Sequence, residues 1–147
     1  MPVYFDIRPD LNLIIYVCLG TVNAVEFYRA ADAATFDARL TDDMKIIIDL
    51  FSAQLDAFPS DLPLALRKKK QMDQEGRKLG QTAVITKSSG LKFMADALKL
   101  MSSQSPVTID VFHNIQDALI WLGLLDIKEE VIQFLTDFKR ESMEKVV

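Results

Sequence analysis

Residues 13–26 read LIIYVCLGTVNAVE, an unbroken apolar run followed by the start of a helix. The run of seven apolar residues ends at Leu19, just before Gly20, and it predicts a strand that is covered on both faces of its sheet. Asn23 stands three residues before Glu26, which is the spacing of a capping box, so we expect a helix to begin directly after this strand. A strand and a helix in immediate succession favour an α/β fold.

Other segments carry the strand pattern on both sides of this stretch. Residues 3–7 precede it, and the Pro and Asp of residues 8–11 favour a turn, so an antiparallel hairpin is expected. Further strands are expected at 45–50, which contains three consecutive Ile residues, at 81–86 and at 107–112. Because helices separate these later strands, we expect them to pair in parallel through right-handed crossovers.

The helices follow from apolar residues at helical spacing. In the first of them, Val25, Tyr28 and Ala31 are expected to face inward, followed by Ala34 or Thr35. The whole order is ββαβαβαβα, so we expect an α/β fold with a mixed, mostly parallel sheet of about five strands. The expected helices cover roughly residues 24–39, 62–79, 91–101 and 115–122, and an extra C-terminal helix covers roughly residues 128–143.

Composition narrows the class of protein. The 147 residues are 50% hydrophobic and 26% charged, which is typical of one globular domain. The net charge of −4 argues against a nucleic-acid binder, and a single cysteine excludes an intrachain disulfide. No segment approaches the roughly 20 apolar residues of a membrane span, and the N-terminus does not resemble a secretory signal, so a cytoplasmic location is expected.

Five short segments carry a further signal: GTV at 20–22, YRA at 28–30, IIIDL at 46–50, AVIT at 83–86 and VFHNIQDALIWLG at 111–123. Together they resemble the SpoIIAA-like family of the STAS superfamily, and the last segment is the most specific. The resemblance covers about residues 1–124. It implies a single STAS-like or CRAL-TRIO-like α/β domain without an established catalytic role, in a superfamily of anti-sigma-factor antagonists, transporter tails and apolar-ligand binders.

Residues 125–147 extend beyond the part that resembles the family. They predict an amphipathic helix with a wide apolar stripe. Two interpretations remain open: the helix packs on its own domain, or it forms a contact in a homodimer. The stripe consists of Ile127, Val131, Phe134 or Leu135, and Phe138.

The residues that could carry catalysis have simpler explanations. Cys18 lies inside the apolar run, where a small core residue is expected rather than a nucleophile. His113 is the only histidine, which argues against both a zinc site and a catalytic base. The Gly-x-Ser-x-Gly motif of hydrolases is absent from the sequence. We therefore expect a protein that is not an enzyme and that needs no metal and no cofactor.

A binding module for a small apolar or amphipathic molecule is the favoured hypothesis. Six Met and nine Phe suit an adaptable apolar lining, although core packing explains the same residues. Parallel sheets place ligands beyond the carboxyl ends of their strands, so the mouth is expected near Phe51, Ser52, Lys87, Ser88 and His113. Lys87 or His113 would meet a polar head group. Further candidate lining residues are Phe58, Phe93, Met94 and Trp121.

The alternative is a protein–protein interaction domain that resembles anti-sigma-factor antagonists without their phosphoserine switch. In those relatives the serine is followed two residues later by Gly, whereas residues 57–62 here read AFPSDL. Asp61 would also repel a phosphate on Ser60, so Ser60 is predicted to be a helix cap and not a kinase target. The basic run Arg67–Lys70 fits either an anionic partner or a solvated helix face.

Overall fold

A computed structural model describes residues 3–41, 43–55, 67, 80–87 and 109–146. The predicted helices at 62–79 and 91–101 lie outside the described residues, apart from Arg67. Phe58, Ser60, Ser88, Phe93 and Met94 also lie outside them. The described elements are β1 (Val3–Arg8), the 3-10 turn η1 (Pro9–Leu11), β2 (Leu13–Cys18), β3 (Gly20–Val22), α1 (Ala24–Ala34), β4 (Lys45–Asp49), β5 (Ala53–Leu55), β6 (Thr82–Ile85), β7 (Ile109–Phe112), α4 (Ile115–Leu122), the 3-10 turn η2 (Leu125–Ile127) and α5 (Lys128–Val146).

Five strands form one mixed sheet in the order β1-β2-β4-β6-β7. β1 runs antiparallel to β2, and the remaining neighbours pair in parallel. The predicted mixed, mostly parallel sheet of about five strands is confirmed. A second, two-stranded parallel sheet joins β3 to β5. It was not predicted, because strands of three residues carry almost no periodic signal.

The hairpin between β1 and β2 closes through η1. Asn12 ends this turn in the left-handed conformation with a φ of 52°, and its N–H donates to the carbonyl of Pro9. Asparagine tolerates this conformation better than most residues. Beside the turn, the guanidinium of Arg8 donates two hydrogen bonds to the carboxylate of Asp10, at 2.6 and 2.8 Å.

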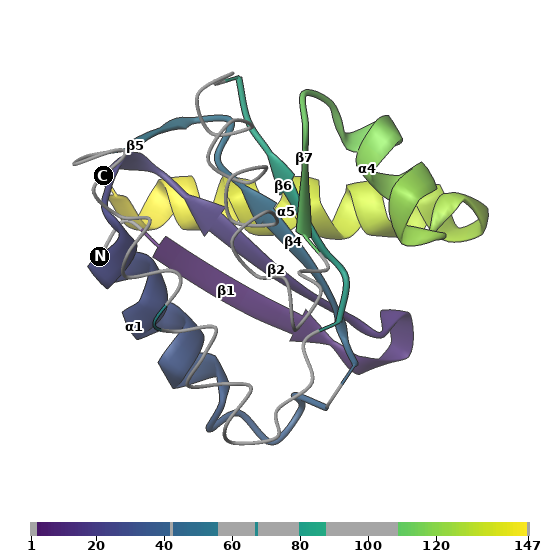
Figure 1. The fold of residues 1–147 in the computed structure, drawn as a ribbon, viewed down its shortest axis with the longest axis horizontal. Helices are drawn as coiled ribbons and strands as arrows, with labels where there is room; N and C mark the ends of the chain where they lie inside the picture. The colour runs from purple at the N-terminus through teal and green to yellow at the C-terminus, as the bar shows by residue number, and fades with distance from the viewer. Residues whose placement is uncertain (1–2, 42, 56–66, 68–79, 88–108, 147) are drawn as a thin grey trace.

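Helices cover the sheet from opposite sides, with α1 on one face and α4 and α5 on the other (Figure 1). The interior strand β2 is buried along its whole length, because alternate side chains contribute to each core. Ile14 and Tyr16 pack in the α1 core, whereas Ile15 and Val17 pack in the core under α4 and α5. The strand predicted from the apolar run at residues 13–19 is therefore buried on both faces of the sheet.

Helix α1 begins with the predicted capping box and ends earlier than predicted. The N–H of Glu26 donates to Asn23 Oδ1 at 2.9 Å, and Asn23 returns the bond at 3.4 Å to the Glu26 carboxylate. The helix ends at Ala34 rather than near residue 39, and the Thr35 hydroxyl donates to the carbonyl of Asp32. The expected inward position of Val25 is also wrong, since this side chain is 51% exposed.

Two helices complete the described chain. Asn114 caps α4 by accepting a hydrogen bond from the N–H of Asp117, and Gly123 ends the helix with a φ of 71°. α5 then crosses the sheet face behind the strands in Figure 1. Its predicted apolar stripe is buried there, in Val131, Phe134, Leu135 and Phe138. In the part of the chain that the structure describes, no helix is both long enough and apolar enough to cross a membrane.

Candidate ligand-binding site at the carboxyl edge of the sheet

The carboxyl ends of β4, β6 and β7 meet at one edge of the sheet. Backbone hydrogen bonds continue just past the strand ends: Leu50 donates to the carbonyl of Ile85, and Thr86 donates to the carbonyl of Phe112. The next residues on the three strands therefore leave the sheet side by side. These residues include Phe51 and Ser52 after β4, Lys87 after β6, and His113 after β7.

Asp49 is the buried polar residue of this edge. It is the last residue of β4 and is only 4% exposed, on the sheet face covered by α5. Its Oδ1 accepts a hydrogen bond from the N–H of Phe51 at 2.9 Å, and its Oδ2 lies 3.2 Å from the Nζ of Lys139 on α5. A carboxylate removed from water needs such partners, so Asp49 fastens both the loop after β4 and the C-terminal helix to the sheet.

The ring of Phe51 contacts two ammonium groups. Lys87 Nζ is 4.6 Å from the ring centroid, and Lys139 Nζ is 5.9 Å from it. Both distances fall within the range of cation–π contacts, and the shorter contact is the stronger one. The residue Phe51 as a whole remains 38% exposed. A partly exposed aromatic side chain in contact with two cations is therefore available at this edge.

The charges of the described side chains at this edge do not cancel. Asp49 neutralises Lys139, whereas within the described chain no carboxylate lies at ion-pair distance from Lys87. Lys87 is exposed, so its ammonium group faces solvent beside the Phe51 ring. Among the described side chains, Lys87 therefore brings one positive charge that favours an anionic group at this position, in a protein whose overall net charge is −4.

His113 is held in place by the residue that precedes Lys87. Its Nδ1 lies 2.8 Å from the carbonyl oxygen of Thr86. A carbonyl can only accept, so Nδ1 donates this hydrogen bond, and in the tautomer that this selects Nε2 is an acceptor. The side chain is exposed at the same edge as Lys87. The imidazole can therefore serve as a polar contact for a ligand.

The structure brings only some of the predicted site residues together. Phe51, Ser52, Lys87 and His113 all lie at the carboxyl edge, and the carbonyl of Ser52 accepts a hydrogen bond from Gly20. Phe58, Ser88, Phe93 and Met94 lie outside the described residues, so their roles stay predictions.

Trp121 is placed differently from these residues. Its ring packs against Phe112, with centroids 5.6 Å apart. Its carbonyl accepts a hydrogen bond from the side chain of Gln81, the residue that precedes β6. The backbone of Trp121 therefore lies toward the amino ends of the strands, and its ring is part of the packing under α4.

Two residues of the edge were missed by sequence reasoning. The signal that could have found Asp49 is a carboxylate directly after three consecutive Ile residues, because a charge that follows a buried run must find a partner. No comparable signal exists for Lys139, one of several lysines on an amphipathic helix.

Cys18 lies in the core close to this edge. It is fully buried, as expected, and burial together with the negative charge of Asp49 raises the pKa of its thiol to about 12. The sulfur is therefore protonated at neutral pH and is a poor nucleophile. Among the described residues, no group of three or more His, Cys, Asp and Glu side chains is arranged to hold a metal ion.

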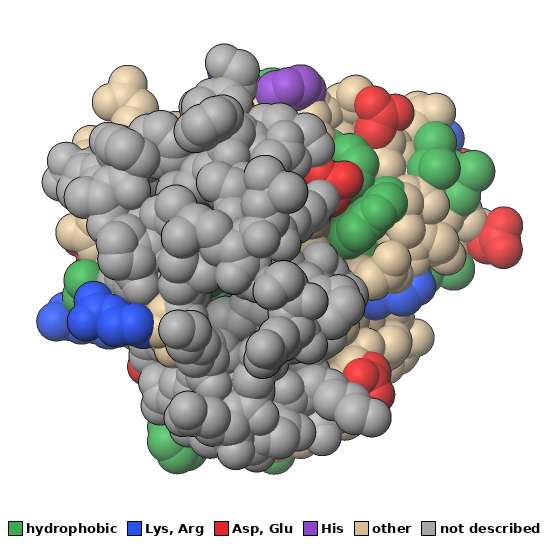
Figure 2. Space-filling model, viewed as in Figure 1, with side chains coloured by type: hydrophobic (Ala, Val, Ile, Leu, Met, Phe, Trp, Pro, Cys, Tyr) green, Lys and Arg blue, Asp and Glu red, His purple; other side chains and the backbone are tan. Residues whose placement is uncertain are grey.

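A second exposed feature lies on α4 and the turn after it. The described surface over α4 shows hydrophobic side chains next to acidic ones (Figure 2). Ile120 is 55% exposed, and Leu125 of η2 is 48% exposed. Single exposed apolar residues are common on protein surfaces, and here two of them lie on α4 and on the turn that follows it.

Comparison with known proteins finds similarity at the level of the fold. No protein-family model and no curated protein sequence matches the chain. Among solved structures, the chain is similar to an uncharacterized protein from the DUF3478 family with a SpoIIAA-like fold, from Shewanella loihica PV-4. The two chains share 15% sequence identity with a TM-score of 0.51, over 82% of this chain and 91% of the other.

The protein therefore has a mixed α/β architecture of the SpoIIAA-like type. The resemblance inferred from the sequence is confirmed at the level of the fold. At 15% identity the similarity identifies neither a ligand nor a partner.

Proposed function

We propose that the protein is a non-catalytic binding module that holds a small amphipathic molecule with an anionic head group at the carboxyl edge of its sheet. The observation that carries the proposal is the partly exposed side chain of Phe51, with the ammonium group of Lys87 4.6 Å from the centroid of its ring. The head group would contact Lys87, the apolar part would lie against Phe51, and a hydroxyl group of the ligand would donate to Nε2 of His113. The fold is consistent with this role, because open α/β sheets bind ligands beyond the carboxyl ends of their strands.

The two parts of the ligand would be recognised by different forces. Burying the exposed part of an aromatic face removes apolar surface from water, at roughly 25 cal/mol per Å². Lys87 adds a charge-assisted contact for a carboxylate or phosphate oxygen. Because Asp49 and Lys139 fix the loop of Phe51, the ring is already in place before the ligand arrives.

The test is a fluorescence titration with cis-parinaric acid, an anionic fatty acid probe, and with its neutral methyl ester. The full-length protein should bind the acid saturably and more tightly than the ester. Lys87→Ala should weaken binding of the acid roughly tenfold and leave the ester almost unchanged, since one charge-assisted contact is lost. Phe51→Ala should weaken binding of both probes.

Lys128→Ala is the matched control. Lys128 starts α5, about 16 Å along the helix from Lys139 at 1.5 Å per residue, and its loss changes the net charge equally. It should bind both probes like the unmodified protein. The proposal would be abandoned if neither probe bound saturably, or if Lys87→Ala and Lys128→Ala gave the same affinity for the acid.

A regulatory protein–protein interaction domain is the second candidate. The exposed Ile120 and Leu125 on the α4 side favour it, since exposed apolar side chains can contact a partner. Native mass spectrometry of the protein purified from its host separates the two functions. A co-purified small molecule supports the binding module, whereas a stoichiometric complex with another protein supports the regulatory domain.

A further inference from the structure

The strands β1 and β7 form the two edges of the described five-stranded sheet. The outer side of an edge strand carries backbone N–H and C=O groups that another strand can pair with. Proteins that remain dispersed at high concentration need some means of preventing this pairing. Both edge strands here show the same local arrangement of an aspartate and a backbone amide.

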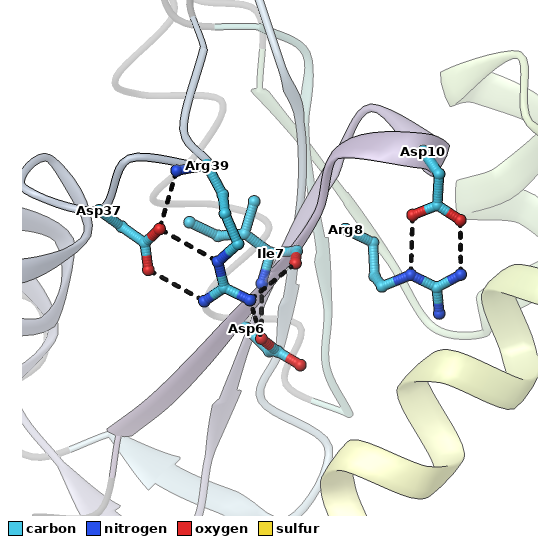
Figure 3. A network of polar contacts seen from close by, with 6 residues as sticks. All are labelled: Asp6, Ile7, Arg8, Asp10, Asp37 and Arg39. Atoms are coloured by element: carbon cyan, nitrogen blue, oxygen red, sulfur yellow. Dashed lines mark hydrogen bonds and ion pairs between the residues drawn. The ribbon is translucent and has the colours of Figure 1, made fainter.

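On β1 the arrangement surrounds Ile7. The N–H of Ile7 donates to Oδ1 of the preceding residue, Asp6, at 2.9 Å, and its carbonyl accepts from Nη1 of Arg39 at 3.2 Å (Figure 3). Both backbone groups of Ile7 therefore point away from β2 and are occupied by side chains. Arg39 is itself oriented by Asp6, at 3.0 Å, and by two hydrogen bonds to Asp37.

On β7 the arrangement surrounds Val111. The carbonyl of Phe112 accepts a hydrogen bond from Thr86, so the backbone groups of Phe112 face β6. Neighbouring residues of a strand alternate in this respect, and the N–H of Val111 therefore points outward. It donates to Oδ1 of the preceding residue, Asp110, at 2.8 Å. The same contact between an aspartate and the next backbone amide thus occurs on both edge strands of the described sheet.

We propose that Asp6 with Arg39 on one edge, and Asp110 on the other, block the pairing of either edge with a strand of a second copy of this chain. An incoming strand would have to displace a carboxylate from the N–H and then leave that charged group beside the new pair of strands. Hydrogen bonds to a carboxylate are stronger than those between neutral groups, so the exchange is unfavourable. This inference is independent of the proposed ligand.

The unmodified protein provides the first test, through hydrogen exchange of individual amides. Phe5 lies two residues before Ile7 on β1, so its N–H also points outward, and among the described residues no side chain accepts from it. The amides of Ile7 and Val111 should exchange roughly fivefold more slowly than that of Phe5, after correction for sequence, since a net hydrogen bond is worth about 1 kcal/mol. Equal exchange of the three amides would overturn the proposal.

The second test removes the blocking side chains. The variants Asp6→Ala/Arg39→Ala and Asp110→Ala are compared with the unmodified protein by light scattering across a concentration series and by thioflavin T fluorescence. Both should form larger species at concentrations where the unmodified protein does not. Asp10→Ala removes the same charge from a carboxylate that pairs with Arg8, and it should behave like the unmodified protein.

Asp6→Asn separates the cap from the charge. It retains an oxygen at the position of Oδ1 and should keep most of the protection of the Ile7 amide from hydrogen exchange. Because this variant preserves the hydrogen bond, its result does not depend on whether the alanine variants fold. Unchanged oligomeric state in both alanine variants, or equal aggregation of Asp10→Ala, would contradict the proposal.

Discussion

Asp49 joins three parts of the molecule through one carboxylate. Replacing it by Ala would leave the ammonium group of Lys139 and the N–H of Phe51 without their buried acceptor. We expect Asp49→Ala to lower the free energy of unfolding by about 3 kcal/mol, because breaking a buried pair from one side leaves the partner uncompensated. Urea denaturation followed by circular dichroism measures the change.

The control for this prediction is the double variant Asp49→Ala/Lys139→Met, which removes both charges and keeps the apolar stem of the lysine. It should recover part of the lost stability. A double variant less stable than Asp49→Ala would show that Lys139 contributes mainly through other contacts.

Cys18 makes the free energy of unfolding depend on pH in the alkaline range. Burial raises the pKa of its thiol from 9.0 to about 12 in the folded protein. A raised pKa in the folded state stabilises the protein below the pKa of the unfolded chain, and this stabilisation is lost as the pH rises toward about 12. Burial raises the pKa of Tyr16 as well, which adds to the same trend.

The free energy of unfolding should therefore fall as the pH rises from about 9 to 11, and the slope should be shallower in Cys18→Ala. Urea titrations at several pH values measure both slopes. As a second measurement, the thiol of the native protein should react with a disulfide reagent at pH 8 only as fast as the protein unfolds. Rapid reaction without unfolding would contradict the buried placement of the sulfur.

At the scale of elements, α5 covers the core on one face of the sheet. Truncation after Leu125 would remove Val131, Phe134, Leu135 and Phe138, each of which contributes on the order of 1.5 to 3 kcal/mol when buried. Their sum approaches the whole stability of a typical domain. We expect the truncated chain to lose its cooperative thermal transition.

Truncation after Met143 is the matched control, because it keeps the buried stripe and removes residues of which Glu144 and Lys145 are exposed. It should melt close to the full-length protein in a calorimetric scan. A chain truncated after Leu125 that kept its melting temperature would show that α5 is dispensable for folding.

The elements also show what the sequence can predict. The strands β2, β4 and β6 were predicted because long apolar runs are required by burial on both faces. The end of α1 was wrong by about a turn, because Thr35 and the residues after it form hydrogen-bonded turns that periodicity does not detect. The pair β3 and β5 was missed, since only tertiary pairing distinguishes three extended residues from a loop.

The position of the candidate site could be predicted in part, whereas one of its contacts could not. The rule that places ligands at the carboxyl edge depends only on strand order, and it located Phe51, Lys87 and His113 at that edge. The contact between Asp49 and Lys139 joins β4 to a helix at the far end of the described chain. Such a pairing depends on how α5 lies across the sheet, which no local pattern encodes.

At the scale of the whole molecule, Gly80 allows two distant segments to meet. It lies just before β6, and a Cβ added to it would be 2.2 Å from the carbonyl oxygen of Met44, which precedes β4. Any side chain would push these two segments apart at the amino ends of two paired strands. We expect Gly80→Ala to destabilise the protein by more than the roughly 1–2 kcal/mol of a strained left-handed residue.

Gly20→Ala is the comparison, because Gly20 has a φ of 71° but no atom within 4 Å of the added Cβ. Thermal unfolding should rank Gly80→Ala as the less stable of the two variants. The opposite ranking would mean that the segment before β4 moves at little cost.

The covering of β2 by α5 has a consequence for biosynthesis. Ile15 and Val17 belong to β2, whereas Phe134 and Phe138 from α5, which is made much later, pack in the same core. About 120 residues separate Val17 from Phe138. Translation at 5–20 residues per second therefore takes roughly 6 to 24 s to reach Phe138 after Val17 has been added, and α5 cannot cover this face of the sheet before then. During that interval the growing chain exposes an apolar surface that chaperones can bind, and slower translation lengthens the exposure in direct proportion.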